Sequence, residues 1–175
     1  MTIVKKGEPD YHVYILAVWS QHDAYFAHKE NIIYAATSIY ATAVAYALIT
    51  ESLWKVPVPE QSVIIFVSIQ LTAFVFNFVK WQLTNRRIAG IISESSQFLS
   101  HQWLTTPPSP NDLELIELET EGSPMRYPRA IAGKYVELNQ VSKVSEFENK
   151  ITVLFWILAS LLTLRGLHSI FVSSL

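Results

Sequence analysis

The chain has 175 residues, half of them hydrophobic, no cysteine and a formal net charge of −2 at pH 7. The absence of cysteine excludes disulfides, thiolate zinc sites and cysteine nucleophiles. Three apolar segments each have about the 20 residues that a helix needs to cross the hydrocarbon core of a bilayer. Only one modest soluble unit fits beside them.

The first 30 residues carry charges and histidines throughout and have no small-residue cleavage pattern, so no cleaved signal peptide is expected. Apolar residues between Tyr11 and Phe26 recur at spacings of three and four, which is typical of an amphipathic helix. We expect this helix, within residues 1–30, to lie along the membrane surface or to pack beneath it.

Two segments, Asn31–Trp54 and Ser62–Trp81, are predicted to be the first two transmembrane helices. The turn between them holds two prolines, which cannot continue a helix, so residues 31–81 are expected to form a tight hairpin. The apolar stripe of the second helix continues to Leu104, and a proline-rich segment then ends it. This predicts a long second helix that leaves the membrane.

Residues 82–150 are expected to form a cytoplasmic helical stalk, with a proline-rich and acidic loop at 105–128. Within that loop, Asp112–Glu121 fits a short strand, a capped helical turn or a mobile segment, and the sequence does not decide among them. From about Arg129 a second amphipathic helix is predicted to run directly into the third span, Ile151–Val172, within residues 151–175. Glu146 and Lys150, four residues apart in the favourable order, support its continuity.

Two amphipathic arms bury little surface as a pair, so each apolar stripe needs a further partner. Either a homo-oligomer supplies it, or the N-terminal helix folds back and completes a three-helix bundle within one chain. The fold class predicted is an all-α membrane protein with three transmembrane helices and cytoplasmic amphipathic extensions that form a stalk.

The orientation follows from the cations, because Lys and Arg accumulate on the cytoplasmic side. Eleven of the thirteen precede the first span, or lie between the inner end of the second span and the start of the third. This predicts a membrane protein with its N-terminus in the cytoplasm and its C-terminus outside.

Polar residues within the spans are the candidate pore lining. Gln70 and Asn77 lie seven residues apart on one face of the second span, where they either line a pore or form hydrogen bonds between helices. Arg165 and His168 lie one turn apart in the third span. They either form an outer constriction that faces an aqueous path, or the arginine reaches the outer headgroups. Glu51 and Lys55 are expected to form an ion pair.

Charged residues of the tip loop are the candidate regulatory site. The acidic run that contains Asp112, Glu114 and Glu117 is either a solvated loop or a docking site for a basic partner. Arg126 and Arg129 flank a tyrosine and a proline, a small element that suits phosphate contact and base stacking. A soluble regulatory protein or a nucleotide or nucleic-acid ligand is therefore a candidate partner at the stalk.

No catalytic motif is present. The five glycines are scattered and form no phosphate-binding loop or nucleophile elbow, and four histidines, His12, His22, His28 and His101, have no zinc-ligand spacing. We therefore expect neither an enzyme, nor a metal site, nor a cofactor.

The stretch His22-Asp-Ala-Tyr-Phe-Ala-His-Lys-Glu-Asn31, followed by an alanine- and tyrosine-rich first span, resembles the juxtamembrane region of small multi-span effectors of bacterial anti-phage defence systems, such as a Hailong-type channel. The resemblance implies an oligomeric effector that a partner or nucleotide-derived ligand keeps closed, and that depolarises the inner membrane when released. The sequence thus predicts an oligomeric channel in the lipid bilayer. The alternative is a non-conducting anchor or scaffold that recruits a soluble partner.

Overall fold

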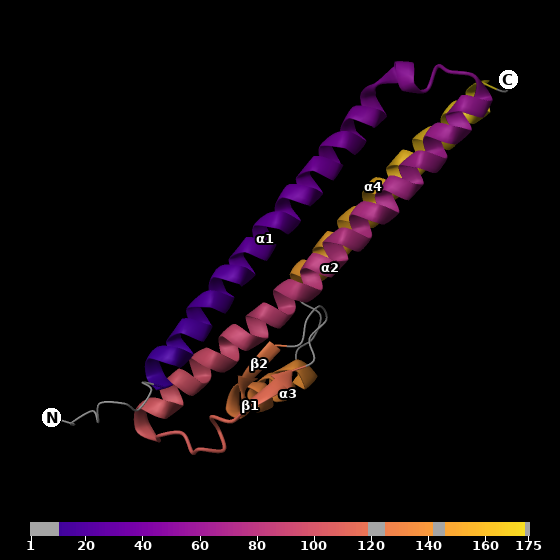
Figure 1. Cartoon of the computed structure of the whole chain (residues 1–175). Coiled ribbons are helices and arrows are strands. Elements are labelled where there is room, and N and C mark those ends of the chain that lie inside the picture. The colour runs from indigo at the N-terminus through magenta and orange to yellow at the C-terminus, as the bar shows by residue number, and fades with distance from the viewer. Residues whose placement is uncertain (1–10, 119–124, 142–145, 174–175) are drawn as a thin grey trace. The chain divides into compact units, whose positions relative to one another are not determined.

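The computed structural model describes residues 11–118, 125–141 and 146–173. Its elements, labelled in Figure 1, are α1 (Tyr11–Ile49), the short 3-10 helix η1 (Glu51–Leu53), α2 (Val58–Thr105), β1 (Leu115–Leu118), β2 (Met125–Pro128), α3 (Arg129–Val141) and α4 (Glu146–Ser173). They belong to two units. The hairpin unit comprises the described residues of 1–29 and 84–143, and the helical unit those of 30–83 and 144–175.

Three of the described helices, α1, α2 and α4, are long and apolar enough to cross a membrane. They correspond to the three spans that the sequence predicted. The all-α prediction is also confirmed for the described residues, with one short two-stranded hairpin added to the helices.

Helix α1 is a single helix of 39 residues. The sequence predicted a surface helix up to residue 30 and a separate span from Asn31. Neither glycine nor proline occurs between Tyr11 and Ile49, so nothing interrupts the backbone hydrogen bonds between the two segments. Residues 11–30 and the first span therefore belong to one helix and not to two. That residues 11–30 lie along the membrane surface or pack beneath it stays a prediction.

The turn between α1 and α2 lies where the prolines predicted it. Pro59 stands in the first turn of α2, where a missing N–H leaves no helical hydrogen bond unmade. Helix α2 then runs for 48 residues and ends at Thr105, just before Pro107. The predicted long second helix is confirmed.

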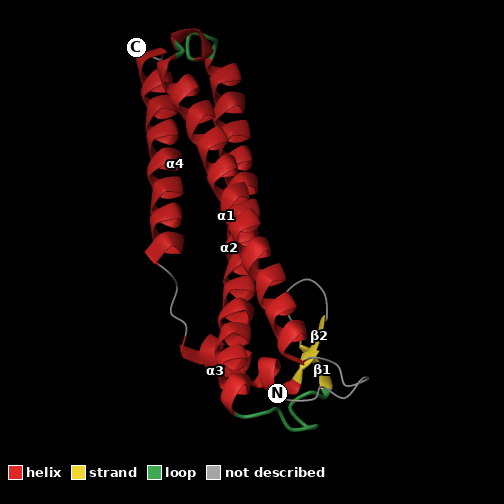
Figure 2. Ribbon diagram, turned by 90° about the vertical axis from the view of Figure 1, so that its left-hand side faces the viewer, coloured by secondary structure: helices red, strands yellow, loops and turns green. Residues whose placement is uncertain are grey.

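In the helical unit, parts of α1 and α2 and the whole of α4 lie side by side (Figures 1 and 2). Their buried apolar residues form one cluster: Ile33, Tyr40, Val44, Trp54, Val79, Leu83, Ile151, Phe155 and Leu162. The Tyr40 ring stacks on Phe155, with 4.9 Å between the ring centroids. Each helix therefore contributes to a common core, and further partly buried apolar side chains pack against it.

The hairpin unit contains the two strands. β1 pairs with β2 in an antiparallel ladder that sets Ile116 opposite Tyr127 and Glu117 opposite Arg126. Along β1, Leu118 is buried and Glu117 is exposed, as the alternation of a half-buried strand requires. Of the three possibilities for the acidic segment, a short strand is thus the one adopted by Leu115–Leu118.

The core of the hairpin unit joins three helices and the strands. It consists of Ile15, Val18, Ile91, Ile92, Leu99, Leu118, Tyr127, Ile131, Ala132 and Tyr135. Because Ile15 and Val18 belong to the N-terminal part of α1, one chain covers its own apolar stripes. Of the two partners considered for the stalk, the N-terminal helix is the one that packs there.

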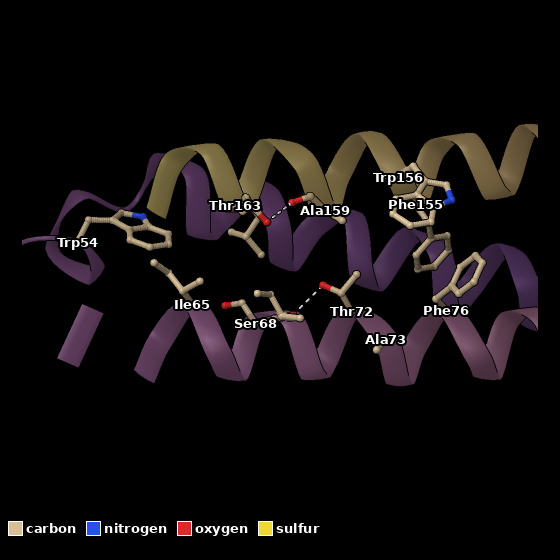
Figure 3. A pocket seen from close by; sticks show the side chains of 12 residues that line it. Trp54, Ile65, Ser68, Thr72, Ala73, Phe76, Phe155, Trp156, Ala159 and Thr163 are labelled. Atoms are coloured by element: carbon tan, nitrogen blue, oxygen red, sulfur yellow. Dashed lines mark hydrogen bonds between the residues drawn. The ribbon is translucent and has the colours of Figure 1, made fainter. Parts of the chain in front are cut away.

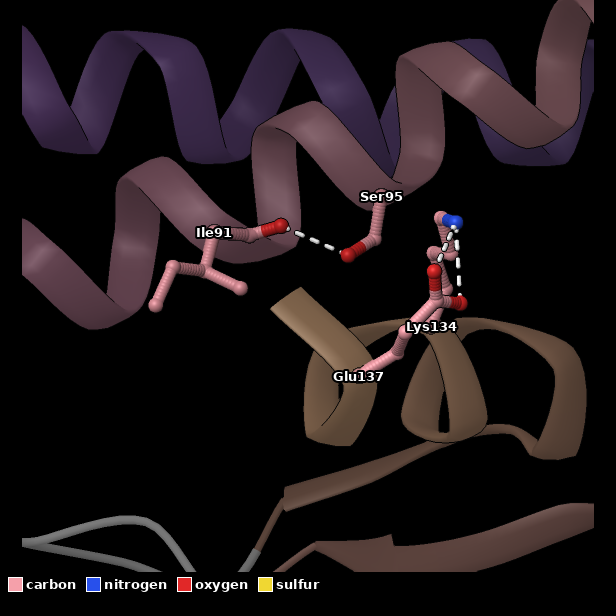
Figure 4. Close-up of polar contacts among 4 residues, drawn as sticks. All are labelled: Ile91, Ser95, Lys134 and Glu137. Carbon is pink, nitrogen blue, oxygen red and sulfur yellow. Dashed lines mark hydrogen bonds and ion pairs between the residues drawn. The ribbon is translucent and has the colours of Figure 1, made fainter. Parts of the chain in front are cut away.

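Helix α3 packs beside α2 where the α2 side chains are small. Ser95 and Ser96 are fully buried, and their hydroxyls donate to the carbonyls of Ile91 at 2.7 Å and Ile92 at 2.8 Å. Figure 4 shows Ser95 facing the ion pair between Lys134 and Glu137. The Lys134 ammonium lies 4.4 Å from the centroid of the Phe98 ring, so its charge is held by both a carboxylate and an aromatic face.

The predicted continuous helix from Arg129 into the third span is described as two helices. α3 ends at Val141 after 13 residues, and α4 begins at Glu146; the positions between them, 142–145, lie outside the described residues. Tyr135 is buried in the hairpin unit, whereas Phe147 packs in the helical unit. The apolar residues that the sequence assigned to one long helix therefore pack in two different units. The Glu146 and Lys150 ion pair is confirmed at 2.7 Å.

Candidate functional site

A pocket of the helical unit lies between α2 and α4 (Figure 3). It has a volume of about 430 Å³ and twelve lining residues, none of which is ionisable. Trp54 marks one end, and Phe76, Phe155 and Trp156 mark the other. A site without a titratable group has no acid, base or charged nucleophile, so it suits an apolar occupant.

Two of the three hydroxyl groups that line this pocket are already engaged. Thr72 donates to the Ser68 carbonyl at 2.7 Å, and Thr163 donates to the Ala159 carbonyl at 2.9 Å. The Tyr40 hydroxyl, 2.7 Å from the Thr72 hydroxyl, ties α1 to α2. These bonds turn the two threonine hydroxyls toward the helices, and methyl groups and rings form most of the lining.

Trp54 holds the end of the helical unit together. Its indole N–H donates to the Ala47 carbonyl at 2.7 Å, and its own carbonyl accepts from Gln61 Nε2 at 2.9 Å and from Ser169 Oγ at 2.8 Å. Gln61, fully buried, also donates to the Val56 carbonyl at 2.8 Å. The α1–α2 turn and α4 are therefore joined through one residue.

A second pocket, of about 190 Å³, lies at the Trp54 end and contains the charges of the unit's turn. Arg165 and His168 line it from α4, and Glu51 and Lys55 line it from the turn. The predicted ion pair is confirmed, with Lys55 Nζ 2.6 Å from the Glu51 carboxylate. Arg165 adds a further electrostatic attraction to Glu51. The role of Arg165 and His168 as an outer constriction remains a prediction.

Gln70 and Asn77 line neither of these pockets. Both are exposed on α2, as are the large apolar residues Phe66 and Phe74 on the same helix. The structure thus places the two amides on an outer face of the single chain. A pore lined by these two amides would require more than one copy of the chain, and that role remains a prediction.

The charged residues of the predicted regulatory loop are brought together by the hairpin. Arg129 forms an ion pair with Glu114 at 2.5 Å, and Arg126 stands opposite Glu117 in the ladder. Asp112 accepts from the Ser109 N–H at 2.8 Å and from its hydroxyl at 2.7 Å, and these bonds hold the pKa of its carboxyl below the ordinary range. Residues 119 and 121 of the acidic run lie outside the described residues.

These contacts close the hairpin. The Arg129 N–H donates to the Glu114 carbonyl at 2.8 Å and the Ala130 N–H to the Asp112 carbonyl at 3.1 Å, which joins β2 and α3 to the segment before β1. Glu117 and Arg126 remain exposed. Glu114 and Arg129 are exposed as well, but they are paired with one another.

A buried polar pair lies inside the hairpin unit. The Tyr127 hydroxyl is 3.0 Å from His22 Nε2, across 105 positions of sequence, and which group donates depends on the histidine tautomer. Burial lowers the pKa of His22 and, with smaller contributions from Tyr14 and Tyr135, raises the pKa of Tyr127 to about 12. Both side chains are therefore neutral at physiological pH.

Sequence reasoning missed Trp54, Gly166 and the Tyr40 and Thr72 contact. The sequence places Trp54 only at the end of the first predicted span, and its long-range bond to Ser169 reveals its structural role. Gly166 is buried where α4 crosses Ile65. The glycine itself is the signal in the sequence that could have indicated this close approach, because it has no side chain.

Among the described residues, no group of three His, Cys, Asp or Glu side chains is placed to hold a metal ion. Comparisons with protein-family models, with curated proteins and with solved structures find no match to this chain. The function is therefore argued from the chain's own residues.

Proposed function

We propose that this chain is one subunit of a homo-oligomeric membrane channel. The observation that carries the proposal is the exposure of Gln70 and Asn77 on one face of α2, in a stretch that is otherwise long and apolar enough to cross a bilayer. Seven residues are close to two helical turns, so the two amides lie one above the other.

An amide that faces hydrocarbon without a hydrogen-bond partner costs on the order of 2 kcal/mol or more. Two such amides on one face of α2 therefore favour an arrangement in which that face does not contact lipid. Neighbouring copies, each presenting the same stripe, supply either amide partners or a water-filled path between them. Phe66 and Phe74, 63% and 72% exposed, flank the stripe and suit burial against the neighbouring copies.

In this proposal α1 from about residue 31, α2 to about Trp81 and α4 cross the inner membrane. The distribution of Lys and Arg supports a cytoplasmic N-terminus and hairpin unit, with the Trp54 end of the helical unit outside. Opening is a two-state rearrangement of the helices, biased by whatever binds the hairpin unit. The exposed pair of Glu117 and Arg126 is the candidate contact for a soluble regulatory protein or a nucleotide ligand.

The likeness of residues 22–31 to effectors of anti-phage defence extends the proposal to a biological role. An effector of this kind stays closed until a signal releases it and then depolarises the inner membrane. This part of the proposal rests on the resemblance alone.

The test is ion flux through the purified protein in a planar bilayer. The Gln70→Leu and Asn77→Leu double variant removes both amides from the stripe and keeps the helix apolar. The matched control, Thr42→Leu with Ser160→Leu, removes two exposed polar side chains from α1 and α4 instead. We expect discrete current steps from the native protein and the control, and none from the amide variant, with the same oligomer in all three.

The second candidate function is a non-conducting anchor that recruits a soluble partner through the hairpin unit. It is favoured by the mostly apolar lining of the pocket between α2 and α4, which contains no ionisable residue. A silent bilayer in the presence of an intact oligomer would favour the anchor. Current steps that persist in the amide variant would refute the assignment of Gln70 and Asn77.

A further inference from the structure

The pocket of about 190 Å³ at the Trp54 end of the helical unit has a positive lining. Lys55 and Arg165 carry permanent cations, His168 supplies a ring nitrogen, and Glu51 is the one acid among the seven lining residues. Arg165 and His168 project from neighbouring turns of α4, whereas Lys55 comes from the α1–α2 turn. The pocket is therefore built by two segments that converge.

Arg165 has donors to spare in this pocket. A guanidinium stays charged and carries five N–H donors. Among the residues that the structure describes, none accepts a hydrogen bond from it, and its electrostatic partner Glu51 already binds Lys55 at 2.6 Å. The half-buried guanidinium thus faces a space that lacks a second anion.

We propose that this pocket binds the phosphate group of an anionic phospholipid. Arginine matches the oxygens of a phosphate with two parallel N–H bonds, and lysine adds a point charge beside it. The proposal rests on the membrane placement in the proposed function, which puts the Trp54 end at the outer leaflet, and it is independent of conduction.

Apolar side chains beside the pocket select a lipid over a free phosphate. Leu164 and Phe171 lie four residues before and three residues after His168, which places them next to it on the surface of α4. They are 63% and 64% exposed. A ligand that carries a phosphate and a hydrocarbon chain meets both the cations and these apolar neighbours, whereas inorganic phosphate meets the cations alone.

This assignment gives Arg165 and His168 a role other than the outer constriction. The cations and the carboxylate of the pocket all come from one chain, so the site is complete without a second copy. A ring of arginines around a pore instead requires each guanidinium to face its symmetry mates.

The experiment is binding of phosphatidylglycerol to the purified full-length protein in detergent, measured by native mass spectrometry, with phosphatidylcholine and inorganic phosphate as separate arms. Arg165→Gln removes the guanidinium, and Lys55→Gln removes the second cation from an exposed position of the turn, where the fold tolerates it. Lys150→Gln is the matched control, because it removes an exposed lysine that pairs with a glutamate four residues away, as Lys55 does.

A charge-assisted contact is worth roughly 1.5–3 kcal/mol, so we expect Arg165→Gln and Lys55→Gln each to weaken phosphatidylglycerol binding about tenfold or more. The Lys150→Gln control and the Gln70→Leu and Asn77→Leu variant should bind as the native protein does. The latter result separates this proposal from the channel, since binding then persists without flux.

Three outcomes would overturn the proposal. If phosphatidylglycerol binding is unchanged in both Arg165→Gln and Lys55→Gln, this pocket is not the binding site. If phosphatidylcholine binds equally well and with the same dependence on these variants, the pocket does not select anionic lipids. Displacement of the lipid by inorganic phosphate reassigns the pocket to a free anion.

Discussion

Gly166 is the position at which a single methyl group should have the largest effect on the helical unit. A Cβ added there would lie 2.6 and 2.8 Å from the Cγ1 and Cδ1 atoms of Ile65 and 3.3 Å from the Trp54 ring. These separations are shorter than van der Waals contact, so α4 and α2 must move apart or Ile65 must leave its rotamer. Overpacking of this kind costs about 1–3 kcal/mol, and we expect Gly166→Ala to destabilise the protein by that amount.

Gly133 provides a control with the opposite sign. A Cβ at Gly133, in the middle of α3, meets nothing within 4 Å. Alanine is the better helix former by roughly 0.5–1 kcal/mol, so Gly133→Ala should stabilise the hairpin unit. The same chemical change is thus expected to lower stability at one glycine and raise it at the other.

The assay is reversible unfolding of the full-length protein in mixed detergent micelles, followed by helical circular dichroism and tryptophan fluorescence. Ile65→Ala removes the two clashing atoms, so the double variant Gly166→Ala with Ile65→Ala should lose less stability than the sum of the two single variants. If Gly166→Ala leaves stability unchanged or raises it, α4 does not cross α2 at Ile65 and the geometry of both pockets is wrong.

Three further predictions concern other parts of the chain. Gln61→Leu removes two hydrogen bonds to backbone carbonyls of the turn from a fully buried side chain, and it should lower the unfolding free energy by about 2 kcal/mol in the same titration. Burial lowers the pKa of His22 below its ordinary 6.5, so the unfolded chain takes up a proton first and stability falls as the pH drops below about 6.5. Thermal unfolding on either side of that pH should lose this dependence in His22→Asn and keep it in the exposed His101→Asn; a pH dependence that survives in His22→Asn would assign it elsewhere. Arg129→Ala breaks an exposed ion pair with Glu114 and should cost less than about 1 kcal/mol, whereas a larger loss would mean that the pair organises the hairpin.

The elements that the sequence predicted well are those set by composition over many residues. The spans follow from uninterrupted apolar stretches, and the end of α2 follows from the prolines after Thr105. The sequence placed a boundary at Asn31, and the two units divide within one residue of it, between Lys29 and Glu30. The helix itself does not end there, because neither a glycine nor a proline interrupts α1.

The contacts that build the two pockets were out of reach for a different reason. The bond from Ser169 to the Trp54 carbonyl spans 115 positions, and the contact between His22 and Tyr127 spans 105. Periodicity places a residue on a face of its own helix and is silent on which other helix meets that face. For the acidic run, alternation within β1 was visible, but the partner strand that decides between strand and turn lies on the far side of the loop.

Because Gln61 from α2 and Ser169 from α4 both donate to the Trp54 carbonyl, these hydrogen bonds hold α4 to α2 and the turn at that end of the helical unit. Glu146 lies 23 positions before Ser169, or about 34 Å along the helix at 1.5 Å per residue. A tilt of about 5° that leaves Ser169 in place would carry Glu146 through about 3 Å over that lever arm. If the proposed channel opens by such a tilt, the Glu146 end of α4, which the chain connects to α3, is where a signal would produce the largest displacement.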